Sequence, residues 1–136
     1  MMTDNIRILL NYRLEQADES LEAAQVLLDK GLLRPSVNRS YYAMFYAVLA
    51  LLALKKKETS KHSGAISIFD REFVKEGAFP KEFSHWIHSA FDLRQRSDYA
   101  TWHQINPEVA RDTLRDAYAF VKGVKENLRS LMDQPA

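Results

Sequence analysis

The chain has 136 residues, the size of one domain and enough to bury a hydrophobic core without covalent cross-links. It contains no cysteine, which excludes disulfides, zinc–thiolate centres and thiol nucleophiles. Because 19 Lys and Arg residues stand against 18 Asp and Glu residues, the formal charge is +1, and any contact with nucleic acid must come from a local basic patch.

The start of the chain and its longest apolar run both argue against export or membrane insertion. The first five residues lack the basic and then apolar layout of a signal peptide, so we expect a cytoplasmic protein. The longest uncharged apolar run, residues 41–54, has fourteen residues, whereas a membrane-spanning helix needs about 20. This run therefore predicts a buried core helix and no association with a membrane.

The first half of the chain predicts two long helices. Apolar residues recur at steps of three and four from Leu10 to Leu28, and Gly31 follows where a left-handed C-cap is favoured. A second helix is predicted from Pro35 to about Lys57, since proline is tolerated in the first helical turn. Its middle is apolar on every side and rich in alanine, so we expect it at the centre of a bundle.

Three further helices are predicted in the second half. Thr59 or Ser60 caps the third, Pro80 starts the fourth, and Asn106 and Pro107 form the N-cap and first residue of the fifth. The short loops indicate antiparallel neighbours, and no segment alternates with the period of a strand. The fold class is therefore all-α, an up-and-down antiparallel bundle of about five helices.

The fourth helix is predicted to have two different faces. One is a buried apolar face made of Phe83, Trp86, Ile87, Ala90 and Leu93. The other, which we call the polar stripe, consists of Glu82, His85, Ser89, Asp92, Arg96, Tyr99 and His103. If the helix continues that far, Arg96 and His103 lie on one side about two turns apart, roughly 10 Å along the axis. An arginine that holds a phosphate and a histidine that moves a proton near neutral pH are the minimal tools for cutting RNA without a metal.

The same pattern also fits an ordinary solvated helix. Asp92 and Arg96 form an i, i+4 pair of opposite charge, which contributes only a few tenths of a kcal/mol on a surface. Arg94 differs from Arg96 because it continues the apolar line of the helix. We expect Arg94 to have a structural role, either snorkelling to the surface or pairing with an internal carboxylate.

The histidines and the motifs give little support to a metal or a cofactor. His62 and His88 are weaker candidates than Arg96 and His103. With His85 they suggest a metal site, but His85 and His88 supply only an i, i+3 pair without an obvious third ligand, so neither a metal nor a cofactor is predicted. No Gly-rich phosphate loop and no HExxH motif occurs, so nucleotide hydrolysis and zinc protease chemistry lack sequence support.

Three segments resemble, in this order, stretches of the small stand-alone prokaryotic members of the HEPN-domain family. They are residues 38–52 (NRSYYAMFYAVLALL), 61–75 (KHSGAISIFDREFVK) and 93–99 (LRQRSDY). The resemblance runs from about Leu14 to Leu128 and implies that residues 1–136 form a single HEPN-like helical domain. It also implies a homodimer, often encoded beside a minimal nucleotidyltransferase that acts as its antitoxin.

The resemblance also implies a site. Active family members are metal-independent endoribonucleases with an Arg, four to six intervening residues and a His, and the motifs of two protomers line one cleft. Arg96 and His103 match this pattern with six residues between them, as Arg-x6-His. Two positions depart from it, because Ser97 follows Arg96 where active relatives often carry Asn, Asp or His, and Ile105 stands where a tyrosine that some partners modify is found.

The expected reaction is attack of a ribose 2′-hydroxyl on the adjacent phosphate. His103 is the candidate general acid or base, and Arg96 the group that stabilises charge on the phosphoryl oxygens. Asp98 and Tyr99 are candidates for orienting them, and Trp102 either stacks on an unpaired base or lies at a dimer seam.

An alternative function is an interaction or nucleotide-binding module that cuts no bond. In that interpretation the polar stripe docks a nucleotidyltransferase partner or binds a nucleotide. A third interpretation is a purely structural dimer module.

Overall fold

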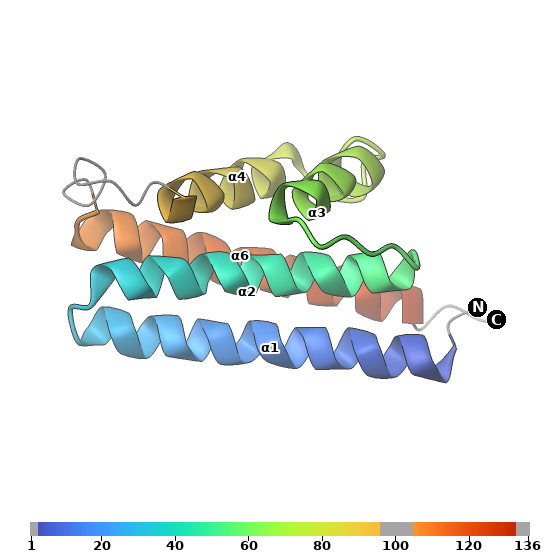
Figure 1. Ribbon diagram of the computed structural model, residues 1–136, viewed down its shortest axis with the longest axis horizontal. Helices are drawn as coiled ribbons and strands as arrows, with labels where there is room; N and C mark the ends of the chain where they lie inside the picture. Colours follow the sequence, from blue (N-terminus) through green and yellow to red (C-terminus); the bar gives the residue numbers. More distant parts are fainter. Residues whose placement is uncertain (1–2, 96–104, 133–136) are drawn as a thin grey trace.

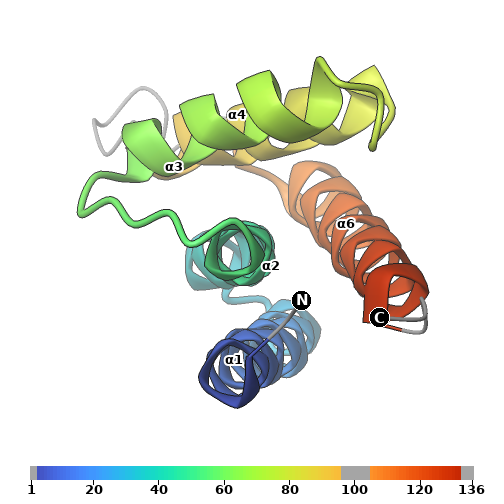
Figure 2. The ribbon, with the colours of Figure 1, turned by 90° about the vertical axis from the view of Figure 1, so that its right-hand side faces the viewer.

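The computed structural model describes residues 3–95 and 105–132. Within these residues the chain forms five α-helices, one π-helical turn and no strand, which confirms the all-α prediction. Figures 1 and 2 show the long helices side by side and the shorter helices lying over them as a second layer. The elements are α1 (Asp4–Asp29), α2 (Leu33–Leu54), α3 (His62–Phe69), η1 (Asp70–Val74), α4 (Lys81–Gln95) and α6 (Pro107–Met132).

The ends of the first two helices follow local backbone chemistry. Gly31 adopts a φ of 75° just after α1, as predicted from its position. α2 begins two residues before Pro35, so this proline lies in the first turn, where its missing N–H is tolerated. α2 ends three residues earlier than predicted because the backbone turns into the left-handed region at Lys56, with a φ of 56°.

The predicted cap of the third helix is wrong. α3 begins only at His62, because the residues between α2 and α3 form a linker that runs back along α2 (Figure 1). The Thr59 hydroxyl accepts a hydrogen bond from the Lys61 backbone N–H at 3.3 Å, inside the linker itself. The cap of α6 is as predicted, because Asn106 Oδ1 accepts from the Val109 N–H at 2.9 Å.

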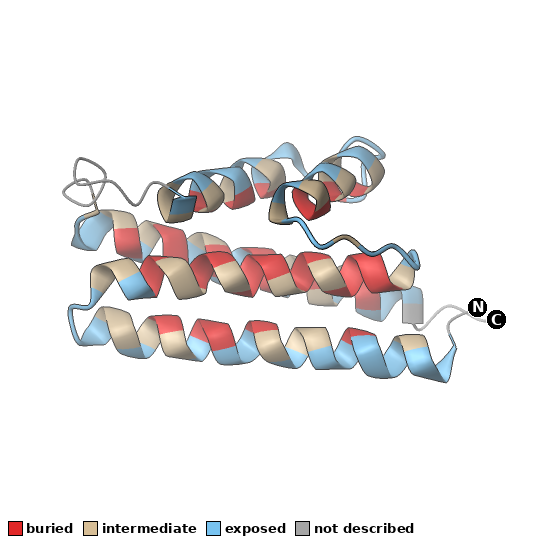
Figure 3. Ribbon diagram, viewed as in Figure 1, coloured by how far each residue is buried: buried red, intermediate tan, exposed pale blue. Residues whose placement is uncertain are grey.

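α2 is the centre of the bundle, as its all-round apolar sequence predicts. It contacts α1, α3, α4 and α6, and most of its turns are buried (Figure 3). In the described part of the chain it is the one helix long and apolar enough to cross a membrane by length and composition. However, 67% of that window is buried among the other helices, as in the core helix of a soluble protein.

A cluster of phenylalanine rings joins the two layers. The Phe83 ring of α4 lies 5.3 Å from the Phe120 ring of α6 and 5.1 Å from the ring of Phe79. Gly123 of α6 sits directly beneath Phe83, where the atoms of the ring occupy the space of a Cβ. The absence of a side chain at Gly123 therefore permits α4 to approach α6 closely.

Replacement of this glycine tests the close approach. Gly123→Ala should destabilise the fold by about 1–3 kcal/mol, because the rigid ring must move, even though alanine favours a helix. The free energy of unfolding in urea measures this, and Phe83→Leu should remove most of the penalty in the double variant. If Gly123→Ala alone unfolds at an equal or higher urea concentration than the wild type, the proposed packing is wrong.

Candidate functional site

The predicted catalytic segment lies outside the described residues. This holds for Arg96, Ser97, Asp98, Tyr99, Trp102 and His103. The structure does describe the residues at both ends of the segment, Gln95 at the end of α4 and Ile105 before α6. The surroundings of these two ends therefore define where the segment starts and returns.

The described part of α4 has the two faces that its sequence predicts. Phe83, Ile87 and Ala90 are buried, whereas Trp86 and Leu93 are half-buried at the edge of the layer. The described residues of the polar stripe are all exposed, namely Glu82, His85, Ser89 and Asp92. The polar stripe is thus a solvent-facing surface on the second layer.

Arg94 fixes the end of α4 to α2. Its Nη2 donates a hydrogen bond of 2.8 Å to the Tyr42 hydroxyl. Its guanidinium carbon lies 5.4 Å from the centroid of the Tyr41 ring and 5.0 Å from that of Tyr42, within the range of cation–π attraction. Of the two expected arrangements, snorkelling or pairing with a carboxylate, the described residues show neither an acidic partner nor an ion pair, and Arg94 contacts two tyrosines of α2. The structural role that was expected for Arg94 is therefore filled by aromatic rings.

His62, at the start of α3, belongs to the same cluster. Its Nδ1 lies 2.8 Å from the Tyr41 hydroxyl oxygen, and its ring stacks on Phe45 with centroids 4.1 Å apart and planes 3° apart. Tyr42 meets the edge of the same imidazole at 5.7 Å and 90°. Three aromatic residues of α2 therefore hold His62 in one orientation.

The charge state of this cluster follows from burial and from Arg94. Burial lowers the pKa of His62 below its ordinary 6.5, and the neighbouring Arg94 charge lowers it further. Burial also raises the pKa of the Tyr41 hydroxyl well above its ordinary value, although Arg94 opposes this. At neutral pH, His62 is therefore an uncharged imidazole beside a protonated phenol, and Arg94 carries the positive charge of the cluster.

A hollow of about 410 Å³ brings the two ends of the predicted catalytic segment together. Leu93 and Arg94 line it from α4, Ile105 from the residues that precede α6, and Arg34 and Asn38 from the first turns of α2. The segment that contains Arg96 and His103 thus leaves and re-enters the described structure beside the same part of α2.

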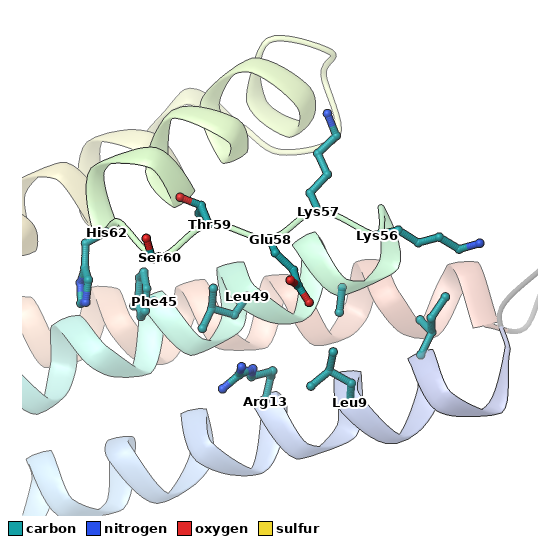
Figure 4. A pocket seen from close by; sticks show the side chains of 12 residues that line it. Leu9, Arg13, Phe45, Leu49, Lys56, Lys57, Glu58, Thr59, Ser60 and His62 are labelled. Carbon is teal, nitrogen blue, oxygen red and sulfur yellow. The ribbon is translucent and has the colours of Figure 1, made fainter.

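A second, larger groove, of about 890 Å³, is lined by His62 and Phe45 among other residues. Figure 4 shows it between α1 and the linker that precedes α3, with His62 and Phe45 at one end. Arg13 reaches into it from α1, and Glu58 points into it from the linker (Figure 4). The groove combines apolar side chains with charged ones.

The described residues contain no group of three His, Cys, Asp or Glu side chains that is placed to hold a metal ion. His88, which the sequence pairs with His85, instead bonds Asp70, with 2.6 Å between Nε2 and Oδ2. This contact joins α4 to η1 at the surface.

Sequence reasoning missed the cluster formed by Tyr41, Tyr42, His62 and Arg94. It assigned His62 only to weak metal binding and Tyr41 only to the core. The available signal was the adjacent tyrosines Tyr41 and Tyr42 in a largely apolar helix, because a buried tyrosine hydroxyl needs a hydrogen-bond partner.

Comparison with known proteins agrees with this all-helical fold and its sequence segments. A family model described as the HEPN domain matches residues 10–127. A UPF0332 protein of Thermotoga maritima is 37% identical over 123 residues, which cover 90% of this chain and 93% of that protein.

Two proteins of Methanocaldococcus jannaschii, each named a "putative toxin", are also similar. One is 33% identical over 132 residues, covering 97% of this chain and 98% of its own length. The other is 36% identical over 117 residues, which cover 86% of this chain and 80% of that protein. The fold is that of a helical HEPN-type domain, and the chain belongs to the HEPN domain family.

The depressed pKa of His62 predicts a pH dependence of stability. At His62 the unfolded chain binds a proton below about pH 6.5, whereas the folded chain binds it only at lower pH. The free energy of unfolding should therefore fall as the pH drops below about 6.5. In His62→Gln this decline, measured by urea unfolding at pH values from about 7.5 to 5.5, should be smaller.

His88→Gln is the matched control, since His88 lies at the surface beside Asp70. As the pH falls, the free energy of unfolding of His88→Gln should decline at least as much as that of the wild type. An unchanged decline in His62→Gln would contradict the assignment of an uncharged, partly buried imidazole.

Proposed function

We propose that the protein is the toxin component of a HEPN and minimal nucleotidyltransferase toxin–antitoxin pair, and that it is a metal-independent endoribonuclease. Membership of the HEPN domain family and the two relatives named putative toxins support the first part. The second part depends on Arg96 and His103. The observation that supports it is that Arg94, which precedes the last described residue before their segment, and Ile105, the first described residue after it, line one hollow beside α2.

In the proposed reaction, the ribose 2′-oxygen attacks the adjacent phosphorus while the bond to the 5′-oxygen of the next nucleotide breaks. A histidine with a pKa near 6.5 is suited to take the proton of the 2′-hydroxyl or to protonate the leaving oxygen, and His103 has this role. Arg96 stabilises the charge on the phosphoryl oxygens. The products are a 2′,3′-cyclic phosphate and a 5′-hydroxyl.

The neighbouring residues and a second protomer complete the proposed site. Asp98 and Tyr99 orient the reacting groups, Ser97 contacts the substrate backbone, and Trp102 stacks on an unpaired base. Two copies of Arg96 and His103 line one cleft of a homodimer, which acts in the cytoplasm until the nucleotidyltransferase antitoxin binds.

A second candidate is an interaction or nucleotide-binding module that docks the nucleotidyltransferase without cutting RNA. The exposure of Glu82, His85, Ser89 and Asp92 favours it, because these residues offer a polar surface on α4. In this case the partner complex forms and RNA stays intact.

Cleavage of single-stranded RNA in EDTA tests the first candidate. The wild type should cleave, and Arg96→Gln and His103→Gln should each lose at least about 100-fold in rate, the lower range for a positioned acid or base. His88→Gln and Arg111→Gln are matched controls on exposed helix surfaces and should keep the wild-type rate. The rates are measured by electrophoresis of end-labelled RNA.

Three outcomes would contradict the proposal. Equal cleavage by all five proteins would show a contaminating nuclease or a different site. A wild type that leaves RNA intact but forms a stable complex with a minimal nucleotidyltransferase would favour the docking module. A monomer in light scattering at micromolar concentration would contradict the shared cleft.

A further inference from the structure

One side of α2 carries aromatic rings and guanidinium groups in series. Arg39, Tyr42 and Tyr46 follow one another at steps of three and four residues, so they lie on one face of the helix, and each is half-buried. Arg94 of α4 contacts Tyr42, and Arg13 of α1 bonds Gln16, which lines the same hollow as Arg39 and Tyr46. We call Arg13, Arg39, Tyr42, Tyr46 and Arg94 the aromatic–arginine face.

The rings and cations of this face pack on one another. The Arg39 guanidinium carbon lies 4.7 Å from the centroid of the Tyr42 ring, which Arg94 approaches from α4. The rings of Tyr42 and Tyr46 are 5.8 Å apart and inclined at 37°. Arg39 and Tyr46 also line a hollow of about 250 Å³ between α1 and α2. The face is therefore a rigid surface with an adjoining depression.

The arginines of this face lack acidic partners within the described residues. Arg13 bonds the Gln16 amide oxygen at 2.9 Å, Arg94 bonds a tyrosine hydroxyl, and Arg39 makes its contact with an aromatic ring. The Nε of Arg39 is buried and has no hydrogen-bond partner among the described atoms. By contrast, Arg115 of α6 pairs with Asp112 at 3.2 Å.

The surroundings of the face are also positive. The three hollows that follow α2 are lined by more Lys and Arg side chains than acidic ones, which are Glu19 and Glu58, although Lys57 pairs with Glu72 at 2.8 Å. This local excess stands out because the whole chain is almost balanced, with 19 basic and 18 acidic residues. A polyanion is the ligand that matches such a surface.

We propose that the aromatic–arginine face binds single-stranded RNA beside the cleavage site, an inference that rests on the proposed function. An unpaired base stacks on Tyr46, while Arg39 and Arg13 hold the phosphates on either side. The row ends at the hollow lined by Arg94 and Ile105, so the bound strand leads to the segment that contains the proposed catalytic residues. Double-stranded RNA does not fit, because its bases are already stacked on one another.

A second copy of the chain is the competing occupant, since tyrosine and arginine are also common at the centres of protein interfaces. A protein partner would have to present carboxylates to three guanidinium groups that lack them within the described structure. RNA supplies phosphates at every nucleotide and bases for the rings. The charge and the rings together therefore favour RNA.

Binding can be measured separately from cleavage. The probe is a fluorescein-labelled single-stranded 2′-O-methyl RNA of about twelve nucleotides in EDTA, which cannot be cut by attack of a 2′-hydroxyl, and the readout is fluorescence anisotropy of the intact protein. Tyr46→Leu should weaken binding about five-fold or more, whereas Tyr46→Phe, which keeps the ring, should stay within about two-fold of the wild type. Arg39→Gln should weaken binding and make the negative slope of log affinity against log salt shallower by about 0.7.

Tyr118→Leu and Arg111→Gln on α6 are the matched controls, because they remove an exposed tyrosine and an exposed arginine. Both should bind as the wild type does, and thermal unfolding should show that all five variants are folded. Equal affinities for Tyr46→Leu and Tyr118→Leu would overturn the inference, and so would a wild type that does not bind the probe. Loss of self-association in Tyr46→Leu without loss of RNA binding would assign the face to a second copy.

The two proposals fail in different ways. If the wild type binds the probe through this face but does not cut ordinary RNA, the proposed cleavage fails and the RNA-binding face stands. If ordinary RNA is cut and the face variants bind as the controls do, cleavage stands and the face is overturned.

Discussion

The contact of Arg94 with Tyr41 and Tyr42 is the interaction on which the candidate site depends. One guanidinium donates to the Tyr42 hydroxyl at 2.8 Å and lies near both rings, and so fixes the last described turn of α4 against the central helix. A hydrogen bond to a charged group contributes about 1.5–3 kcal/mol, more than an exposed ion pair. The segment with Arg96 starts two residues later, so its starting position is set by this contact.

α2 forms the core of the bundle and also positions polar groups, and its sequence reflects both roles. Its alanines and large apolar residues allow helices to pack around it, which explains why it is buried although it resembles a membrane span in composition. Its tyrosines bring hydroxyl groups into this apolar environment, where they bond His62 and Arg94. The same helix thus forms the core and arranges the polar groups beside the candidate site.

Local signals predicted most of the fold but only part of the site. The cap at Asn106 and the left-handed Gly31 involve residues three or four positions apart at most, so the sequence shows them directly. The late start of α3 depends on the path of a linker, which no local pattern encodes. The bond of His62 with Tyr41 spans 21 positions, and that of Arg94 with Tyr42 spans 52, so they appear only once the helices are packed.

Hydrogen exchange at the backbone amides of residues 90–95 tests the central claim most directly. If Arg94 holds the end of α4 on α2, these amides should exchange at least about ten-fold faster in Arg94→Met than in the wild type, while those of α1 and α2 stay unchanged. Arg115→Met, which removes an exposed arginine of α6, should leave residues 90–95 unaffected. Equal exchange at residues 90–95 in Arg94→Met and in the wild type would contradict the claim.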